Sequence, residues 1–203
     1  NEKSVYDEID AEELYANLRC LKAFVDERMR EEHSVMILQE IPHEILDKRT
    51  QRWKWCENEL HRAFIDLFSD QYKIILPKHL IHSYQCSAAI CKKDSLWKQI
   101  DQELLVYDAK YSFGNKVVEL QYQDRISLLG LHMNPSEAMW NLLFQTYRQG
   151  NKHTFIAGDF NAYEQRGTMK DKPQRLRSFG YCPIIPSNVI TEYNDESSID
   201  NIY

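Results

Sequence analysis

Residues 154–161, with the sequence TFIAGDFN, constrain the fold of this chain more than any other stretch. A short apolar run ends here at a glycine, and an acid and an amide follow two positions apart. Bounded apolar runs of this length are typical of buried strands, and residues two apart on a strand share a face. Asp159 and Asn161 are therefore predicted to project together from a core strand. An uncompensated charge at such a place is costly, which indicates a metal, a phosphate or a proton as its partner. Ordinary turn chemistry is the alternative.

Polar residues follow or end three other apolar runs as well. The four groups are Glu40, His132 with Asn134, Asp159 with Asn161, and Asp200. Because α/β folds collect their sites at a shared edge of the sheet, we expect these side chains to meet in one cleft. Three carboxylates without a thiolate cluster favour a hard divalent cation such as Mg²⁺. The pattern therefore predicts metal-assisted phosphoryl chemistry.

The rest of the chain alternates between helical and strand-like patterns. Apolar residues recur at three- and four-residue steps over 11–31 and 51–68, and again after Asn134, which predicts three helices. Strand-like runs cover 35–38, 72–76, 87–91, 104–107, 117–122 and 126–133. The alternation within 117–122 predicts a strand with one face toward solvent.

Residues 162–174 are polar and charged, and we predict a long surface loop there. With the residues that follow, this stretch forms the most basic segment of the chain. Its basic residues are Arg166, Lys170, Lys172, Arg175 and Arg177. A solvated surface is the simple interpretation of such a segment. Since it follows the strand that carries Asp159, we also consider contact with substrate through Arg166.

Length and composition indicate a single folded domain over residues 1–203. Hydrophobic residues make up 43% of the chain and charged residues 28%, and no apolar run approaches the roughly 18 residues of a membrane span. The five cysteines are scattered without a Cys-x-x-Cys pair, which favours reduced thiols and a cytoplasmic location. The net charge of −6 disfavours a protein that depends on non-specific phosphate contacts, but it allows an enzyme with a local basic rim.

Four motifs occur in an informative order along the chain. They are ILQE at 37–40, GLH at 130–132, GDFN at 158–161 and SIDNI at 198–202. In this order they resemble the endonuclease/exonuclease/phosphatase superfamily, which has the deoxyribonuclease I-like fold. The resemblance extends from about residue 12 to the end of the chain. It implies an α/β (α+β) fold, a four-layer αββα sandwich of two mixed sheets with outer helices.

The resemblance also implies a role for each matching residue. Glu40 would be the principal ligand of Mg²⁺, with Mn²⁺ as the alternative ion, and Asp159 would orient or deprotonate the attacking water and contact the metal. Asn161 would donate to a phosphate oxygen, and His132 would lie against the phosphate. Asp200 would orient a catalytic histidine further along the chain.

Two elements of the superfamily pattern are missing from these 203 residues. Relatives carry an asparagine on a strand before the first helix, and a Ser-Asp-His element after the Ile-Asp strand. We therefore expect the domain to lack its first strand and its C-terminal Ser-Asp-His strand here, and the fragment as written to be nearly inactive. Loss of these motifs in a degenerate relative is the alternative.

The function predicted from these features is Mg²⁺-dependent hydrolysis of a phosphodiester by a nuclease or phosphodiesterase. A phosphomonoesterase acting on inositol or nucleotide phosphates is the second reading, and a non-catalytic scaffold of the same fold is the third. A carboxylate-dependent glycosidase is disfavoured because it does not explain the GDFN motif. We expect a monomer that binds a phosphate-ester substrate, nucleic acid included, and that has no membrane span.

Overall fold

The computed structural model describes residues 11–42, 55–78, 85–100, 114–134, 136–148, 153–162, 171–184 and 200–202. The helices are α1 (Ala11–Arg28), α2 (Trp55–Ser69), α3 (Glu137–Arg148) and α4 (Asp171–Ser178). The strands are β1 (Val35–Pro42), β2 (Tyr72–Ile75), β3 (Gln85–Lys92), β4 (Trp97–Gln99), β5 (Val117–Tyr122), β6 (Ile126–His132), β7 (Phe155–Asp159) and β8 (Asp200–Ile202). The predicted strand at 104–107 and Arg166 lie outside the described residues. Within the described part, every helix is too short or too polar to cross a bilayer.

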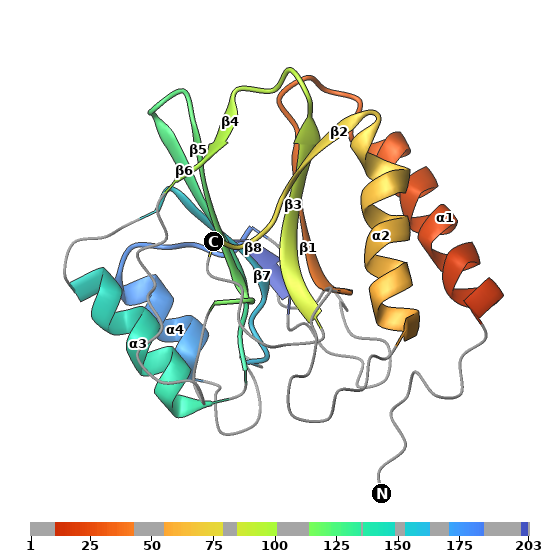
Figure 1. Cartoon of the computed structure of the whole chain (residues 1–203). Helices are drawn as coiled ribbons and strands as arrows, with labels where there is room; N and C mark the ends of the chain where they lie inside the picture. The colour runs from red at the N-terminus through yellow and green to blue at the C-terminus, as the bar shows by residue number, and fades with distance from the viewer. Residues whose placement is uncertain are drawn as a thin grey trace, which may run out of the picture.

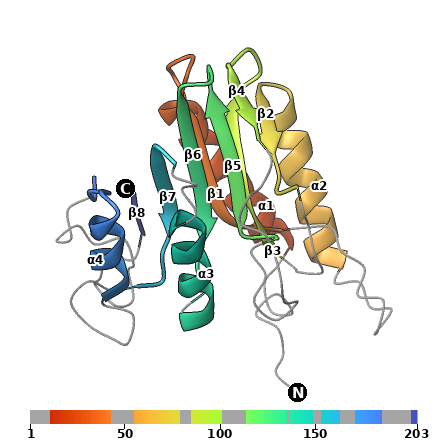
Figure 2. The same cartoon turned by 90° about the vertical axis from the view of Figure 1, so that its left-hand side faces the viewer.

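Two sheets pack face to face between two pairs of helices (Figures 1 and 2). The smaller sheet has the order β1-β3-β2 and is covered by α1 and α2, whereas the larger has the order β4-β5-β6-β7-β8 and is covered by α3 and α4. In the larger sheet β6 and β7 run parallel and the other neighbours antiparallel, so this sheet is mixed. The described strands of the smaller sheet pair antiparallel. The predicted four-layer αββα sandwich is confirmed.

Three buried apolar clusters fill the three interfaces between these layers. The cluster under α1 and α2 includes Phe64, Phe68, Ala88 and Ile90. The cluster between the sheets includes Ala89, Cys91, Val118 and Leu120. The cluster under α3 and α4 includes Leu129, Trp140, Phe144 and Leu176. Successive residues of β3 thus enter different clusters, as the alternation of side chains along a strand requires.

The prediction of a solvent-exposed face on residues 117–122 is wrong. The first four residues of β5, from Val117 to Leu120, are all buried, because helices cover one face of the sheet and the smaller sheet covers the other. The alternating polar residue Glu119 is 1% exposed, and its Oε2 lies 3.2 Å from Nε2 of buried His153. The prediction of a loop over 162–174 is also wrong from Asp171 onward, where α4 begins.

The two sheets approach closely where β1 crosses β6. A β-carbon on Gly130 of β6 would lie 2.8 Å from Cδ1 of Ile37, so the glycine makes room for the side chain of β1. Gln39 follows two residues later on the same face of β1. Its Nε2 would lie 3.0 Å from a β-carbon on Gly158 of β7. These contacts place the end of β1 over the ends of β6 and β7.

Candidate active site

The end of β1 contains an irregularity that redirects Glu40. The register with β3 shifts between Leu38 and Ile41, and Glu40 has a φ of 56°. Such a bulge interrupts the ladder and re-aims a side chain, and a positive φ is uncommon for a residue with a β-carbon. The strand continues beyond Glu40 to Pro42, which pairs with Gln85. Glu40 thus lies near the end of the strand as predicted, but it lies in a bulge and is exposed.

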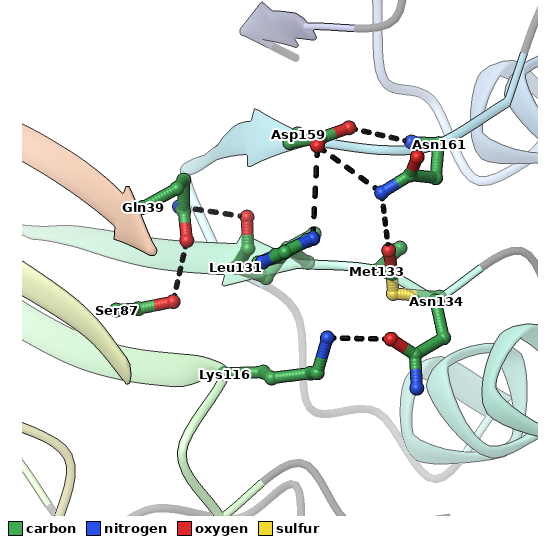
Figure 3. Close-up of polar contacts among 9 residues, drawn as sticks. Gln39, Ser87, Lys116, Leu131, Met133, Asn134, Asp159 and Asn161 are labelled. Atoms are coloured by element: carbon green, nitrogen blue, oxygen red, sulfur yellow. Dashed lines mark hydrogen bonds and ion pairs between the residues drawn. The ribbon is translucent and has the colours of Figure 1, made fainter. Parts of the chain in front are cut away.

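Asp159 and Asn161 are brought together by a turn at the end of β7. The backbone N–H of Asn161 donates to Oδ1 of Asp159 at 2.8 Å, and its side-chain Nδ2 donates to Oδ2 at 3.1 Å. The same Nδ2 donates to the carbonyl oxygen of Met133 at 2.7 Å (Figure 3). Asn161 has a φ of 46°, which asparagine tolerates better than most residues. Asp159 therefore lies at the end of a strand and Asn161 lies in the turn that follows, so both interpretations of this stretch apply.

His132 lies beside Asp159 on the neighbouring parallel strand. The two residues are register partners, and Nε2 of His132 is 3.7 Å from Oδ2 of Asp159. Burial, and secondarily the charge of Lys116, lower the pKa of His132 to about 4. The imidazole is therefore neutral at pH 7, and it can donate or accept a hydrogen bond without adding charge to the site.

Lys116 is a site residue that the sequence analysis did not single out. Its backbone oxygen accepts a hydrogen bond from the N–H of His132 at 2.9 Å, and its Nζ donates to Oδ1 of Asn134 at 2.5 Å. Burial lowers the pKa of Lys116, and the carboxylates of Glu40 and Asp159 partly oppose that shift. The sequence contains a pattern that could have identified Lys116. An antiparallel hairpin with Val117 opposite Leu131 puts residue 116 next to residue 132.

These side chains surround one cavity of about 210 Å³ at the seam between the two sheets. Its lining residues are Glu40, Gln85, Cys86, Ser87, Asn115, Lys116, His132, Asn134 and Asn161. Asp159 contacts two of them, His132 and Asn161. The cavity therefore offers one carboxylate, several amides, a neutral imidazole and an ammonium group, and this set suits a small anion such as a phosphoryl group.

The oxygen donors of this cavity fit magnesium, which the sequence predicted. Among the described residues no three of the types His, Cys, Asp and Glu cluster as a metal cage. Magnesium, however, commonly uses one or two protein carboxylates and takes its other ligands from water and substrate phosphate. Glu40 is exposed and lines the cavity. It is the residue that would hold the ion.

Comparison with known proteins places the fold. No family profile matches the sequence, and no curated protein matches it. Among solved structures, an endonuclease/exonuclease/phosphatase family protein from Leptotrichia buccalis C-1013-b is similar with a TM-score of 0.55 and 16% identity, over 98% of this chain and 84% of that one. The chain has the endonuclease/exonuclease/phosphatase fold. Truncated TDP2 from Caenorhabditis elegans is also similar, with a TM-score of 0.45, 15% identity and 74% of this chain covered; the chain spans 57% of that protein's length.

The fold carries the last predicted site residue to the same sheet edge. Asp200 on β8 is the antiparallel register partner of Asp159, so its backbone lies directly beside that of Asp159. In the endonuclease/exonuclease/phosphatase fold of this chain, four predicted positions therefore come from four strands, Glu40, His132, Asp159 and Asp200, and Asn161 lies in the turn after β7.

Two side chains of the basic segment make contacts between helices α4 and α3. Lys172 is buried, and its Nζ is 2.6 Å from Oε1 of Glu137 on α3. The guanidinium of Arg175 lies 4.2 Å from the ring centroid of Phe144. Both side chains contact α3, and contact of the basic segment with substrate stays a prediction. Arg166 remains a prediction outside the described residues.

Proposed function

We propose that this chain hydrolyses a phosphate ester, a phosphodiester in the first instance, with Mg²⁺ or Mn²⁺ as cofactor. The observation that carries the proposal is the arrangement around Asp159. Its carboxylate is held by two N–H groups of Asn161 and stands 3.7 Å from neutral His132, next to a cavity that Glu40 lines from the other sheet. The shared fold with an endonuclease/exonuclease/phosphatase family protein supports it.

Asp159 is suited to be the general base. Because Asn161 holds both carboxylate oxygens, the carboxylate has a defined orientation toward a bound water. As the water oxygen forms its bond to phosphorus, one water proton passes to Asp159. The bond from phosphorus to the ester oxygen breaks, and the departing oxygen takes the electron pair and a proton from solvent. This is a direct displacement without a covalent enzyme intermediate.

The donors around the cavity are suited to stabilise charge on the phosphoryl oxygens. That charge grows in the transition state, and fixed donors in a shielded site stabilise it strongly. Lys116 supplies an ammonium group and His132 a neutral N–H. Both hydrogens of the Asn161 amide are donated to Met133 and Asp159, so its part is to hold the carboxylate. Magnesium bound at Glu40 would supply Lewis-acid polarisation of a phosphoryl oxygen. Asp200 would orient a catalytic histidine further along the chain, as the superfamily resemblance implies.

The experiment is turnover of bis-p-nitrophenyl phosphate by the full-length protein, with p-nitrophenyl phosphate and DNA as parallel substrates. We expect Mg²⁺-dependent turnover that EDTA abolishes, and a fall in kcat of roughly 100-fold or more for Asp159→Asn and for Glu40→Gln. Asp66→Asn on α2 and Glu27→Gln on α1, both exposed and outside the cavity, are matched controls that should retain wild-type rates.

The substrate panel also separates the three functions considered from the sequence. Faster turnover of the diester or of DNA supports a phosphodiesterase or nuclease, and faster turnover of the monoester supports a phosphatase. Silence of the wild type on all three substrates, with a folded protein, would favour the scaffold. The predictions of a monomer and of a cytoplasmic location need separate measurements by sedimentation and by cell fractionation.

A further inference from the structure

The side chain of Gln39 bridges the two sheets at the seam that forms the cavity. Its Nε2 donates to the carbonyl oxygen of Leu131 on β6 at 2.9 Å, and its Oε1 accepts from the hydroxyl of Ser87 on β3 at 2.5 Å (Figure 3). Gln39 thus links two strands of the smaller sheet to the centre of the larger one. The contact is half-buried, which makes loss of a partner costly.

Each partner of this amide stands next to a residue of the candidate site. Gln39 precedes Glu40, and Leu131 precedes His132. Leu131 is also the register partner of Gly158, the residue before Asp159. One side-chain amide therefore connects the backbone segments that carry Glu40, His132 and Asp159.

We propose that Gln39 is a positioning residue, which holds Glu40 at its working distance from His132 and Asp159. This inference rests on the proposed function and deepens it, because it states how a site divided between two sheets keeps its geometry. The positive φ of Glu40 leaves the bulge dependent on its surroundings.

The contact requires an amide rather than a side chain of similar size. Nε2 must donate to the Leu131 oxygen while Oε1 accepts from Ser87, so a glutamate would set a second acceptor against the carbonyl. A methionine would keep the length but remove both hydrogen bonds. Ser87 determines which end of the amide faces Leu131, and it therefore supports the orientation without making the bridge itself.

The chain contains a matched control for this contact. Nε2 of Gln99 on β4 donates to the carbonyl oxygen of Leu76, which follows β2, at 2.6 Å. It also links the larger sheet to the smaller one with a side-chain amide. In the described sheets, β4 and β2 are edge strands on the side away from β7 and β1. Neither Gln99 nor Leu76 lines the cavity at Glu40. Gln99→Met therefore removes an equivalent bond without touching the site.

The test compares Gln39→Met, Ser87→Ala and Gln99→Met in the full-length protein by two readouts. The first is kcat and KM on the substrate that the wild type turns over. The second is the Mg²⁺ concentration that gives half of the Mg²⁺-induced rise in Tm, which needs no turnover. We expect Gln39→Met to lower kcat at least 10-fold with KM within 2-fold, and to raise that Mg²⁺ concentration at least 3-fold. Ser87→Ala should show smaller changes in the same direction, and Gln99→Met should lower Tm only.

The outcomes separate this inference from the function on which it rests. If the wild type is active and Gln39→Met matches Gln99→Met in both readouts, Gln39 is a structural bond only and the inference is overturned. If the wild type is inactive on every substrate but Gln39→Met still shifts the Mg²⁺ titration, the positioning role stands and hydrolysis fails. A wild type with neither turnover nor a Mg²⁺-induced rise in Tm overturns both.

Discussion

The carbonyl oxygen of Leu131 lies so close to Gly158 across the parallel pair of β6 and β7 that a β-carbon at position 158 would be 1.8 Å from it. Gly158 also has a φ of 143°, a conformation that residues with a β-carbon rarely adopt. Because the same oxygen accepts the amide of Gln39, the glycine allows Asp159 and the inter-sheet bridge to occupy one small region.

Gly158→Ala should destabilise the fold by more than about 3 kcal/mol, since the new methyl group would meet backbone rather than a movable side chain. Gly130→Ala is the control. Its β-carbon would meet side-chain ends of Ile37 and Val118 at 2.8 and 2.9 Å, which can shift, so a cost of about 1–2 kcal/mol is expected. Urea unfolding measures both, and a Gly158→Ala variant as stable as Gly130→Ala would contradict this account.

Asn161 combines a backbone role with a side-chain role, and two substitutions separate them. Asn161→Gly and Asn161→Ala both remove the amide that holds Asp159, so each should lower kcat by roughly 10–1,000-fold. Alanine must in addition adopt the φ of 46°, and should cost about 1 kcal/mol more stability than glycine. Equal unfolding free energies for the two variants would show that the turn relaxes without strain.

The stability of the metal-free protein should fall as the pH drops below neutrality because of His132. Its pKa is about 4 in the folded chain, against 6.5 for an unperturbed histidine. Between these values the unfolded chain binds more protons, so acid favours unfolding. From pH 7 to pH 5 in EDTA, the wild type should lose about 2 kcal/mol more than His132→Gln. Parallel urea titrations at the two pH values test this, and equal losses would exclude His132 as the cause.

Cys86 lines the cavity but should be chemically inert in the native protein. Burial raises its pKa to about 12 and also raises that of Cys91, whereas Cys20 and Cys182 are exposed. Iodoacetamide at pH 8 should label the two exposed thiols at least about 100-fold faster, because the thiolate is the reactive form. Peptide mass spectrometry gives the rates, and a urea-unfolded sample is the reference for full labelling. Rapid native labelling of Cys86 would contradict its burial.

The sequence predicted those parts of the fold that depend on local patterns. Among the described elements, apolar periodicity located the three longest helices and most strands, and the GDFN motif placed Asp159 and Asn161 at the end of β7. Residue 119 shows the limit of such reasoning. Alternation suggested a solvent-facing Glu119, but its environment is set by α3 and by His153, which lies 34 residues further along the chain. No pattern within β5 contains that information.

The candidate site shows the same division between local and distant information. The polar residues at strand ends were predictable one by one. The bulge at Glu40 and the bridge from Gln39 to Leu131, 92 residues away, depend on how two sheets pack. Lys116 lies between these cases, since a hairpin register derived from the sequence would have identified it.

The two halves of the sandwich are also two consecutive halves of the chain. Every described element of the smaller sheet and its helices ends by Lys92, and every described element of the larger sheet and its helices begins at or after Trp97. A break in the four residues between them would leave Glu40 on one fragment and His132 with Asp159 on the other. Turnover would then require the two fragments to reassociate across the seam between the sheets. A chain broken between Lys92 and Trp97 would therefore serve as a split reporter.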